Sequence, residues 1–569
     1  MYILNMASLQ KKISHGRPYW YIVECRRIKG KPRPMVLAYL GSTERLLNRL
    51  LKGERVGSLK VKSYSHGAVY GLWQVASEIG LLAILNQYLP VQKRDGLSVA
   101  ETLLLAAIYR AIRPGSKRSF SEWVCETTLP FLANFSSKNL TSQHFWDQMD
   151  VVSEEALAGI EEVLAKKLVA DLGFSLDTLF YDTTNFFTYV NTGNERSKLC
   201  QRGYNKQKRI DLRQFNLALL VSREAFIPLF SLVYEGNIPD NKSFPEILSR
   251  LRHRLEAINQ RLEDLTLVFD KGNYSAVVQD DLERLSIHWV GSLSSVHYQD
   301  LLGVPIKKFY KVELSNGDEV FAYRCVRKVF GKEMTVVMVL SEKLKDGQLR
   351  GFSRALDRAL KGLTELKNAL QGVRCRYRKE GVLKKVNNFL AREYLKEVIK
   401  VEVKERGEQV SISYKVNDKR CDYLKQEIFG KKILFTDRRD WSEREIIEAY
   451  YGLGRIEQTF RHLKNPYHFT VRPQYHWTDQ KVKVHTFCCL LGLLLGGLVH
   501  WKVRRAGIKI SLEHLLEKLN RIREAVIIEP TGGRGKPRVR RQLEEIPDEI
   551  KRLYEIIQFS IYKPETHKC

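Results

Sequence analysis

The fold is decided by the stretch that begins LDTLFYDTT (176–184), which has the apolar pattern of a buried strand and closes on Asp182. Two apolar runs follow across a short connection, FNLALLVS (215–222) and AFIPLFSLVY (225–234), and they predict an antiparallel hairpin. Further along, the pattern predicts a helix, a strand, a helix and a strand over 247–258, 265–270, 275–285 and 287–293. The predicted order from 176 to 293 is therefore β-β-β-α-β-α-β, which indicates an α/β domain with a mixed sheet.

The regions on either side of this stretch have other patterns and predict separate parts. Residues 1–55 form a small basic β element, 56–172 a helical and DNA-binding domain, 173–295 the first part of the α/β core, 296–436 an insertion, 437–505 the C-terminal helices of the core, and 506–569 a basic tail with a last short helix. The insertion is strand-rich at both ends, helical and basic over 353–400, and we interpret it as largely β. In the tail, TGGRGKPRVRRQ (531–542) is expected to be flexible.

Charge and composition narrow the class of partner. Lys plus Arg number 94 and Asp plus Glu 65, for a formal net charge of +29, which favours a polyanionic partner such as nucleic acid. Ribosomal and membrane-surface proteins share such a charge, so it names no function. The nine cysteines never form CxxC, which argues against a zinc ribbon and fits a reducing cytosol. The longest apolar run, Phe487–Val499, is shorter than the roughly 20 residues of a membrane span. We therefore expect a buried helix there, and a cytoplasmic protein without a membrane partner.

Three carboxylates are candidates for catalysis. Asp182 and Asp270 each close a predicted strand, although either alone is more often a turn former or a helix cap. Glu457 belongs to WSEREIIEAYYGLGRIEQTFRHLK (441–464), which we interpret as one long helix with an apolar stripe against the core. At about 100° per residue, Tyr450, Glu457 and Lys464 fall on one face of that helix. The alternative for an isolated helix is a solvated Glu and Lys pair beside a core stripe.

Together these residues predict a phosphodiester site. Two Asp and one Glu could bind two Mg²⁺ ions, one activating water or a 3′-hydroxyl and the other stabilising the leaving oxygen. Lys464 and Arg461 could contact the phosphate oxygens, and Tyr450 could position the strand. A basic segment after the first strand would line the approach of a nucleic-acid backbone, or else is a solvated loop. It includes Lys206, Lys208 and Arg209.

Several of these motifs resemble those of the insertion-sequence DDE transposases, whose third motif is Tyr-x2-Arg-x3-Glu-x6-Lys. The resemblance rests on YDTTNFF (181–187), VFDKGNYS (268–275), YYGLGRIEQTFRHLK (450–464) and RPQYHW (472–477). Carried over position by position, it implies that Asp182, Asp270 and Glu457 are the catalytic metal ligands and that Tyr450 and Lys464 are the other motif residues. The position of the motif Arg holds Leu453, and Arg455 or Arg461 could replace that Arg only from a different angle.

The resemblance also carries expectations about fold and reaction. It implies a ribonuclease-H-like fold, two Mg²⁺ ions for which Mn²⁺ can substitute, and double-stranded DNA as partner, both element ends and target. The implied reaction frees 3′-hydroxyls at the element ends and joins them to target DNA without a covalent protein intermediate, within a homodimer. Two alternatives stay open: a non-catalytic DNA-binding transposase remnant, and a ribonuclease-H-like nuclease that joins no strands.

Overall fold

The structure is a computed structural model in which two compact units can be recognised. The first unit is Met1–Tyr70, Val124–Thr128 and Glu517–Cys569, and the second is Gly71–Trp123 and Leu129–Leu516. The residues that the structure describes are 7–28, 31–51, 60–91, 93–136, 140–191, 193–205, 209–223, 227–257, 262–270, 276–294, 298–372, 377–406, 409–529, 538–559 and 562.

The first unit holds two small antiparallel sheets. The N-terminal sheet has the order β1-β2-β3 and is followed by a helix, which confirms the small sheet expected there; its elements are β1 (Ala7–Ser14), β2 (Arg17–Ile28), β3 (Lys31–Ser42) and α1 (Thr43–Leu51). The second sheet joins distant parts of the chain in the order β17-β16-β4. It is made of β4 (Lys60–Ser65), β16 (Arg523–Glu529) and β17 (Arg538–Leu543), and α20 (Asp548–Ile556) follows it.

The second sheet corrects the expectation for the basic tail. Residues 538–542 of the segment expected to be flexible lie in β17, in register with β16. They are held there because the Arg541 guanidinium Nε lies 2.5 Å from Oε1 of Glu524, a carboxylate with no exposed surface. A buried carboxylate requires such a charged partner. The remaining part, 531–537, lies outside the described residues.

Helices make up the N-terminal part of the second unit, through Leu172, as the periodicity of residues 56–172 predicts. They are α2 (Gly67–Glu78, which starts in the first unit), α3 (Leu81–Tyr88), α4 (Val99–Ile112), α5 (Lys117–Cys125), α6 (Leu129–Leu132), α7 (Ser142–Asp150) and α8 (Glu154–Leu172). The apolar helix α18 (Asp479–Arg505) packs on α4 so closely that a Cβ at Gly492 would meet the Ala107 carbonyl oxygen at 2.5 Å. By length and composition α18 could cross a membrane, but 94% of its most apolar window is buried inside the protein. The prediction of a buried helix is confirmed.

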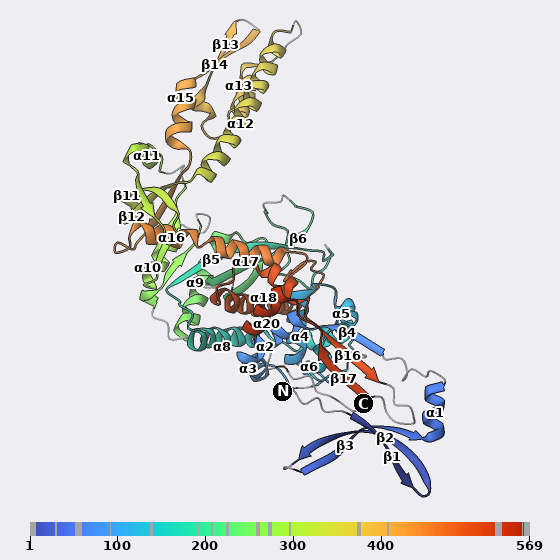
Figure 1. Cartoon of the computed structure of the whole chain (residues 1–569). Coiled ribbons are helices and arrows are strands. Elements are labelled where there is room, and N and C mark those ends of the chain that lie inside the picture. Colours follow the sequence, from blue (N-terminus) through green and yellow to red (C-terminus); the bar gives the residue numbers. More distant parts are fainter. Residues whose placement is uncertain are drawn as a thin grey trace. The chain divides into compact units, whose positions relative to one another are not determined.

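A nine-stranded mixed sheet forms the centre of this unit (Figure 1), in the order β10-β11-β12-β15-β9-β8-β5-β6-β7. The predicted order β-β-β-α-β-α-β is confirmed by β5 (Thr178–Thr188), β6 (Arg213–Ser222), β7 (Pro228–Glu235), α9 (Asp240–Ala257), β8 (Thr266–Val268), α10 (Ala276–Arg284) and β9 (His288–Ser292). The β5–β8 and β8–β9 pairs are parallel, and the other pairs are antiparallel.

The expectation of a largely β insertion is wrong. After α11 (Gln299–Leu302), its strands β10 (Tyr310–Glu313), β11 (Glu319–Val329), β12 (Lys332–Leu340) and β15 (Lys431–Thr436) continue the core sheet beyond β9. Between β12 and β15 lies what we call the inserted module, residues 342–423, whose elements lie together in Figure 1. They are α12 (Glu342–Leu370), α13 (Lys379–Phe389), α14 (Leu395–Val398), β13 (Ile399–Arg406), β14 (Gln409–Val416) and α15 (Asp418–Tyr423). Because α12 alone has 29 residues, the insertion is mixed α and β.

Candidate active site

Two of the predicted aspartates lie level with each other on neighbouring strands. The parallel pair of β5 and β8 matches Thr178 with Thr266 and Phe180 with Val268. The same register, continued by two residues, places Asp182 opposite Asp270. Beyond the end of β8 the chain still follows β9, because the Phe269 amide donates to the Val290 carbonyl at 3.2 Å. Neighbouring strands are about 4.8 Å apart. The two carboxylates therefore belong to one region of the sheet.

Asp270 is held by two hydroxyl donors. The Ser292 hydroxyl, from β9, donates to Asp270 Oδ1 at 2.9 Å, and the Tyr450 hydroxyl donates to the same oxygen at 2.9 Å. The two hydroxyl oxygens lie 3.1 Å apart. Ser292 and Tyr450 are buried, while Asp270 is exposed. Hydrogen bonds to a carboxylate favour its charged form and fix its orientation.

Tyr450 stays a donor because its ionisation is strongly disfavoured. Burial is the largest cause that raises the pKa of Tyr450, and the negative charges of Asp270 and Glu457 raise it further. A phenol that remains protonated can keep donating to the carboxylate. The ammonium of Lys432, from β15, lies 4.2 Å from the centre of the Tyr450 ring. This geometry is a cation–π contact.

A cavity of about 550 Å³ opens beside Asp270. Three lysines share its lining with Asp270 and Ser292: Lys431, Lys432 and, from α12, Lys343. Lys431 is buried and donates to the Leu302 and Val304 carbonyls at 2.7 Å and 2.6 Å, and burial lowers the pKa of Lys431 to about 8. The cavity thus places a carboxylate among cationic side chains, an environment suited to an anionic substrate.

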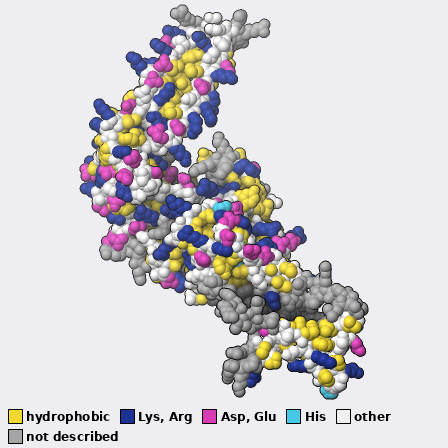
Figure 2. Space-filling view, viewed as in Figure 1, with side chains coloured by type: hydrophobic (Ala, Val, Ile, Leu, Met, Phe, Trp, Pro, Cys, Tyr) yellow, Lys and Arg dark blue, Asp and Glu magenta, His cyan; other side chains and the backbone are white. Residues whose placement is uncertain are grey.

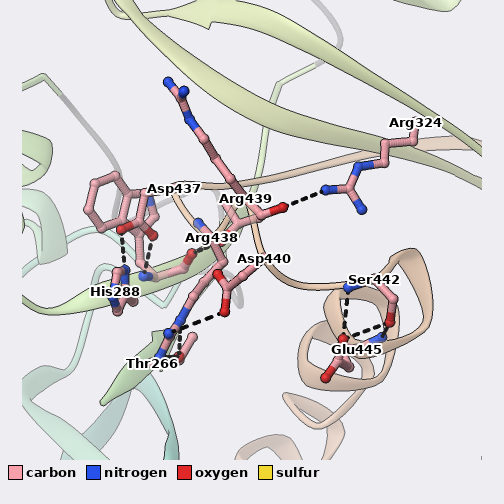
Figure 3. Close-up of polar contacts among 11 residues, drawn as sticks. Thr266, His288, Arg324, Asp437, Arg438, Arg439, Asp440, Ser442 and Glu445 are labelled. Atoms are coloured by element: carbon pink, nitrogen blue, oxygen red, sulfur yellow. Dashed lines mark hydrogen bonds and ion pairs between the residues drawn. The ribbon is translucent and has the colours of Figure 1, made fainter. Parts of the chain in front are cut away.

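The helix that carries Tyr450, α16 (Glu443–Tyr451), is anchored at its start (Figure 3). Asp437 accepts from the His288 ring at 2.5 Å and from the Trp289 amide at 3.0 Å, so the end of β15 is tied to β9. Arg324 of β11 donates to the Trp441 and Arg439 carbonyls. The first turn of the helix then closes with a capping box of Ser442 and Glu445.

The single long helix predicted over 441–464 is wrong. The chain forms α16, breaks at Gly452 and Leu453, and continues as α17 (Gly454–Lys464). A Cβ at Gly452 would meet the Phe180 ring of β5 at 2.1 Å, so only glycine permits this close approach. Across the break the constant angle per residue no longer applies. Tyr450 is buried against Asp270, whereas Glu457 is exposed.

The second helix, α17, follows the face of β5 that carries Asp182. Phe180, Asp182, Thr184 and Phe186 alternate onto one face of the strand. The helix break contacts Phe180 on that face, and Lys464 at the other end of α17 donates to the Thr184 hydroxyl. Glu457 lies on the helix between these two contacts. The backbone thus brings the third predicted carboxylate over the strand that holds the first.

The carboxylates suit a divalent cation in donor type but do not form a finished site. Among the described residues, no group of three or more His, Cys, Asp and Glu side chains is arranged to hold a metal ion. The donors are all carboxylate oxygens, the ligands that Mg²⁺ prefers. Asp182 also accepts from its neighbouring Thr183 amide at 2.8 Å. The Glu457 charge acts within this region, because it is among the charges that raise the pKa of Tyr450, a donor to Asp270.

Two cations lie on the same side of β5. Lys464 Nζ is 5.5 Å from the centre of the Phe186 ring, and the Arg472 guanidinium is 5.9 Å from that ring and 5.2 Å from the Phe187 ring. Two Arg472 nitrogens, Nε and Nη2, are buried and have no hydrogen-bond partner among the described residues. Arg472 lies in RPQYHW, but the sequence did not single it out as a cation for phosphate. The predicted cation Arg461 is exposed on α17.

The other predicted contacts have mixed outcomes. Arg209 is exposed and forms a two-pronged ion pair with Asp211, with Nε and Nη2 at 2.8 Å and 2.7 Å from its oxygens. This pair lowers the pKa of Asp211 to about 2. Lys206 and Lys208 lie outside the described residues. Leu453, at the position of the motif Arg, is buried at the start of α17.

Of the comparisons with known proteins, the one with protein families gives a match over the core. Residues 173–493 match the model of a family described as "Transposase DDE domain". Among curated proteins, none matches the chain. One similar solved structure is a cryo-EM structure of the piggyBac transposase synaptic complex with hairpin DNA, with 9% identity and a TM-score of 0.34 over 79% of this chain and 78% of that chain. So low a TM-score supports no conclusion on its own.

Proposed function

This chain belongs to the DDE transposase family, since the family match covers more than half of its residues. From that premise we propose that it binds the ends of its own mobile element, cuts the DNA to free 3′-hydroxyls and joins them to target DNA. Transposition, a form of DNA recombination, is the function of the family. The cutting, the joining and the residues that perform them are our proposal.

We propose a ribonuclease-H-like core formed by β5 to β9. The spatial order β7-β6-β5-β8-β9, with β5, β8 and β9 parallel and β6 antiparallel to β5, supports this proposal. In such a sheet, ligands gather at the carboxyl ends of neighbouring parallel strands. Asp270 follows the carboxyl end of β8, and Asp182 lies level with it in the middle of β5. The strands of the insertion then lengthen this core on the β9 side.

Asp182, Asp270 and Glu457 are the proposed catalytic residues. They would hold two Mg²⁺ ions, or Mn²⁺ in their place, which supply an activated water or 3′-hydroxyl and stabilise the leaving oxygen. The observation that carries the proposal is the shared register of Asp182 and Asp270, with α17 and Glu457 across the same strand. Ser292 and Tyr450 orient Asp270 for this task.

Positive charge around the carboxylates would bind the DNA backbone. Lys464 and Arg472 both lie near the Phe186 ring, and two buried Arg472 nitrogens have no hydrogen-bond partner that a phosphate oxygen would have to displace. We therefore assign to Arg472 the phosphate contact that Leu453 cannot make. With this exception, the Tyr, Glu and Lys of the Tyr-x2-Arg-x3-Glu-x6-Lys group fall on Tyr450, Glu457 and Lys464. DNA as substrate implies a cytoplasmic location, and we expect a homodimer in the DNA complex.

Mapping the DNA products tests the whole proposal. The protein is incubated with duplex DNA that carries its own element's ends, with and without Mg²⁺, and strand ends are mapped. Cuts that leave 3′-hydroxyls at the element boundary, followed by joined products, support the proposal. Cuts without joining indicate a nuclease, and binding without cuts indicates a non-catalytic remnant.

Replacing Lys464 with alanine should weaken cleavage more than binding. Lys464 is anchored to Thr184, two residues beyond Asp182, so its charge acts near the reacting phosphate rather than along the flanking DNA. We expect cleavage to fall by about 10- to 100-fold and affinity by less than about threefold. Cleavage rates and binding isotherms on the same duplex measure the two effects. Lys307→Ala, an exposed lysine before β10, is the control. Equal losses in both measurements would make Lys464 a general anchor.

The hydroxyl contacts of Asp270 predict a change in metal requirement. Tyr450→Phe and Ser292→Ala each remove a hydroxyl donor to Asp270 Oδ1. Because a hydrogen bond to a charged group contributes about 1.5–3 kcal/mol, each variant should cleave about tenfold more slowly and need more Mg²⁺ for half-maximal rate. A titration of cleavage against Mg²⁺ measures this shift, with exposed Tyr467→Phe as the control. A lower thermal stability with an unchanged Mg²⁺ requirement would show that the hydroxyls only support the fold.

A further inference from the structure

One face of α12 carries a row of cations. Lys343, Arg350, Arg354 and Lys361 are seven, four and seven residues apart. At about 100° per residue these spacings keep all four within about 20° of a single line along the helix. All four side chains are exposed. We call these residues the α12 row.

The opposite face of α12 is the one that packs. Its buried residues are Phe352, Ala355, Ala359, Gly362, Leu363 and Leu366, which lie about 100–200° from the α12 row. At Gly362 a Cβ would meet the Phe389 ring of α13 at 2.8 Å, so this face is closed against its neighbour. The α12 row is therefore not required to stabilise the inserted module.

Acidic residues of α12 flank the row without pairing with it. On α12, the acidic residues Asp346, Asp357 and Glu365 lie about 40–60° to the side of the row. Within the ranges that the structure describes, none of the four cations forms an ion pair. Asp346 and Asp357 lie four residues before Arg350 and Lys361, the spacing of helical ion pairs, but neither pair is formed in the structure. A row of side chains that all carry positive charge favours an anionic partner.

The row begins at the candidate active site. Lys343 lines the same cavity as Asp270, together with Lys431 and Lys432. From Lys343 the row extends for eighteen residues, which at 1.5 Å per residue is about 27 Å. That distance equals the axial length of about eight base pairs. Figure 2 shows Lys and Arg side chains along the surface of the inserted module.

We propose that the α12 row binds the sugar-phosphate backbone of duplex DNA at the point where that DNA enters the cavity beside Asp270. This inference rests on the proposed function, since it names the surface that guides the substrate to the carboxylates. Arginine and lysine side chains at these intervals contact phosphate oxygens without reading the bases. The contribution is therefore independent of DNA sequence and depends on salt.

The test compares two variants of the full chain with the same loss of charge. The first carries K343Q, R350Q, R354Q and K361Q, and the second carries K307Q, K308Q, R327Q and K328Q, four exposed cations around β10 and β11. Binding to a duplex of about 30 base pairs is measured by fluorescence anisotropy across a salt series. We expect the first variant to lose about 3 units of the slope of log affinity against log salt, and the second to lose less than about 1.

The outcomes separate this inference from the proposed function. Equal slopes for both variants, or an unchanged slope for the first, would overturn the role of the α12 row while the wild-type protein still binds DNA. A wild-type protein that binds no DNA would instead overturn the proposed function. Thermal unfolding of each variant checks folding, and R354Q with K361Q is the milder pair if the four-fold variant unfolds. For that pair, the slope of log affinity against log salt should fall by about half as much as for the four-fold variant.

Discussion

Asp182→Asn, Asp270→Asn and Glu457→Gln are each expected to reduce Mg²⁺-dependent DNA cleavage by at least about a thousandfold. Each substitution keeps the shape of the side chain but removes the negative charge that a divalent cation requires. DNA affinity should stay within about twofold, because phosphate contacts come from lysine and arginine side chains. Single-turnover cleavage and anisotropy binding on one duplex measure both quantities.

Glu448→Gln is the matched control for Glu457→Gln. Glu448 lies on α16, before the helix break, and accepts from the Ser315 amide at 2.5 Å and from Arg444 at 3.3 Å. It supports the contact with the loop after β10. We expect its variant to cleave at nearly the wild-type rate. Full cleavage by any of the three site variants would remove that residue from the active site.

Salt is expected to weaken DNA binding steeply. An excess of 29 positive charges favours many phosphate contacts, each of which releases counterions from the DNA. With six or more such contacts, affinity should fall by about 10³-fold between about 50 mM and about 200 mM salt. Anisotropy titrations at four salt concentrations would give the slope directly.

The salt dependence of DNA binding is checked with a second anion. Replacing chloride by glutamate at equal concentration separates anion binding to the protein from cation release by the DNA. A flat dependence over this range would contradict a phosphate-dominated interface. It would leave the carboxylate site untouched, because the two depend on different residues.

Local patterns predicted the elements of the core well. The alternation of apolar residues from 176 to 293 was sufficient for the order of strands and helices, because each strand is buried and bounded by turn-forming residues. The same pattern placed Asp270 correctly just after a strand, but the prediction that Asp182 closes its strand is wrong, because β5 continues to Thr188. Their shared register needed the structure, since strand pairing depends on contacts between distant parts of the chain.

The helix break could not be predicted from periodicity. The apolar stripe continues through Gly452 and Leu453, so the pattern of 441–464 is that of one helix. At the break, Phe180 of β5 occupies the space beside Gly452, a tertiary contact that no local pattern reveals. The glycines at 452 and 454 were the one local signal for it. The same limit applies to Ser292, Lys432 and Lys343, which matter only through what the fold brings beside Asp270.

The insertion was misjudged for a related reason. Its strands were recognised, but their continuity with the core sheet arises from the pairing of β15 with β9, across residues far apart in the sequence. Predicting them as a separate β part followed from reading each segment alone. The 29-residue helix α12 makes the insertion mixed α and β rather than largely β.

The pairing of Leu340 with Lys431, the last residue of β12 and the first of β15, has a consequence for how such a protein can change. The chain leaves the sheet at Leu340 and returns to it at Lys431, and these two residues are paired with each other. The two ends of the inserted segment are therefore adjacent in the sheet. Closing a longer or shorter detour costs little extra entropy. The inserted module can therefore be lengthened, shortened or replaced while the core sheet keeps its register.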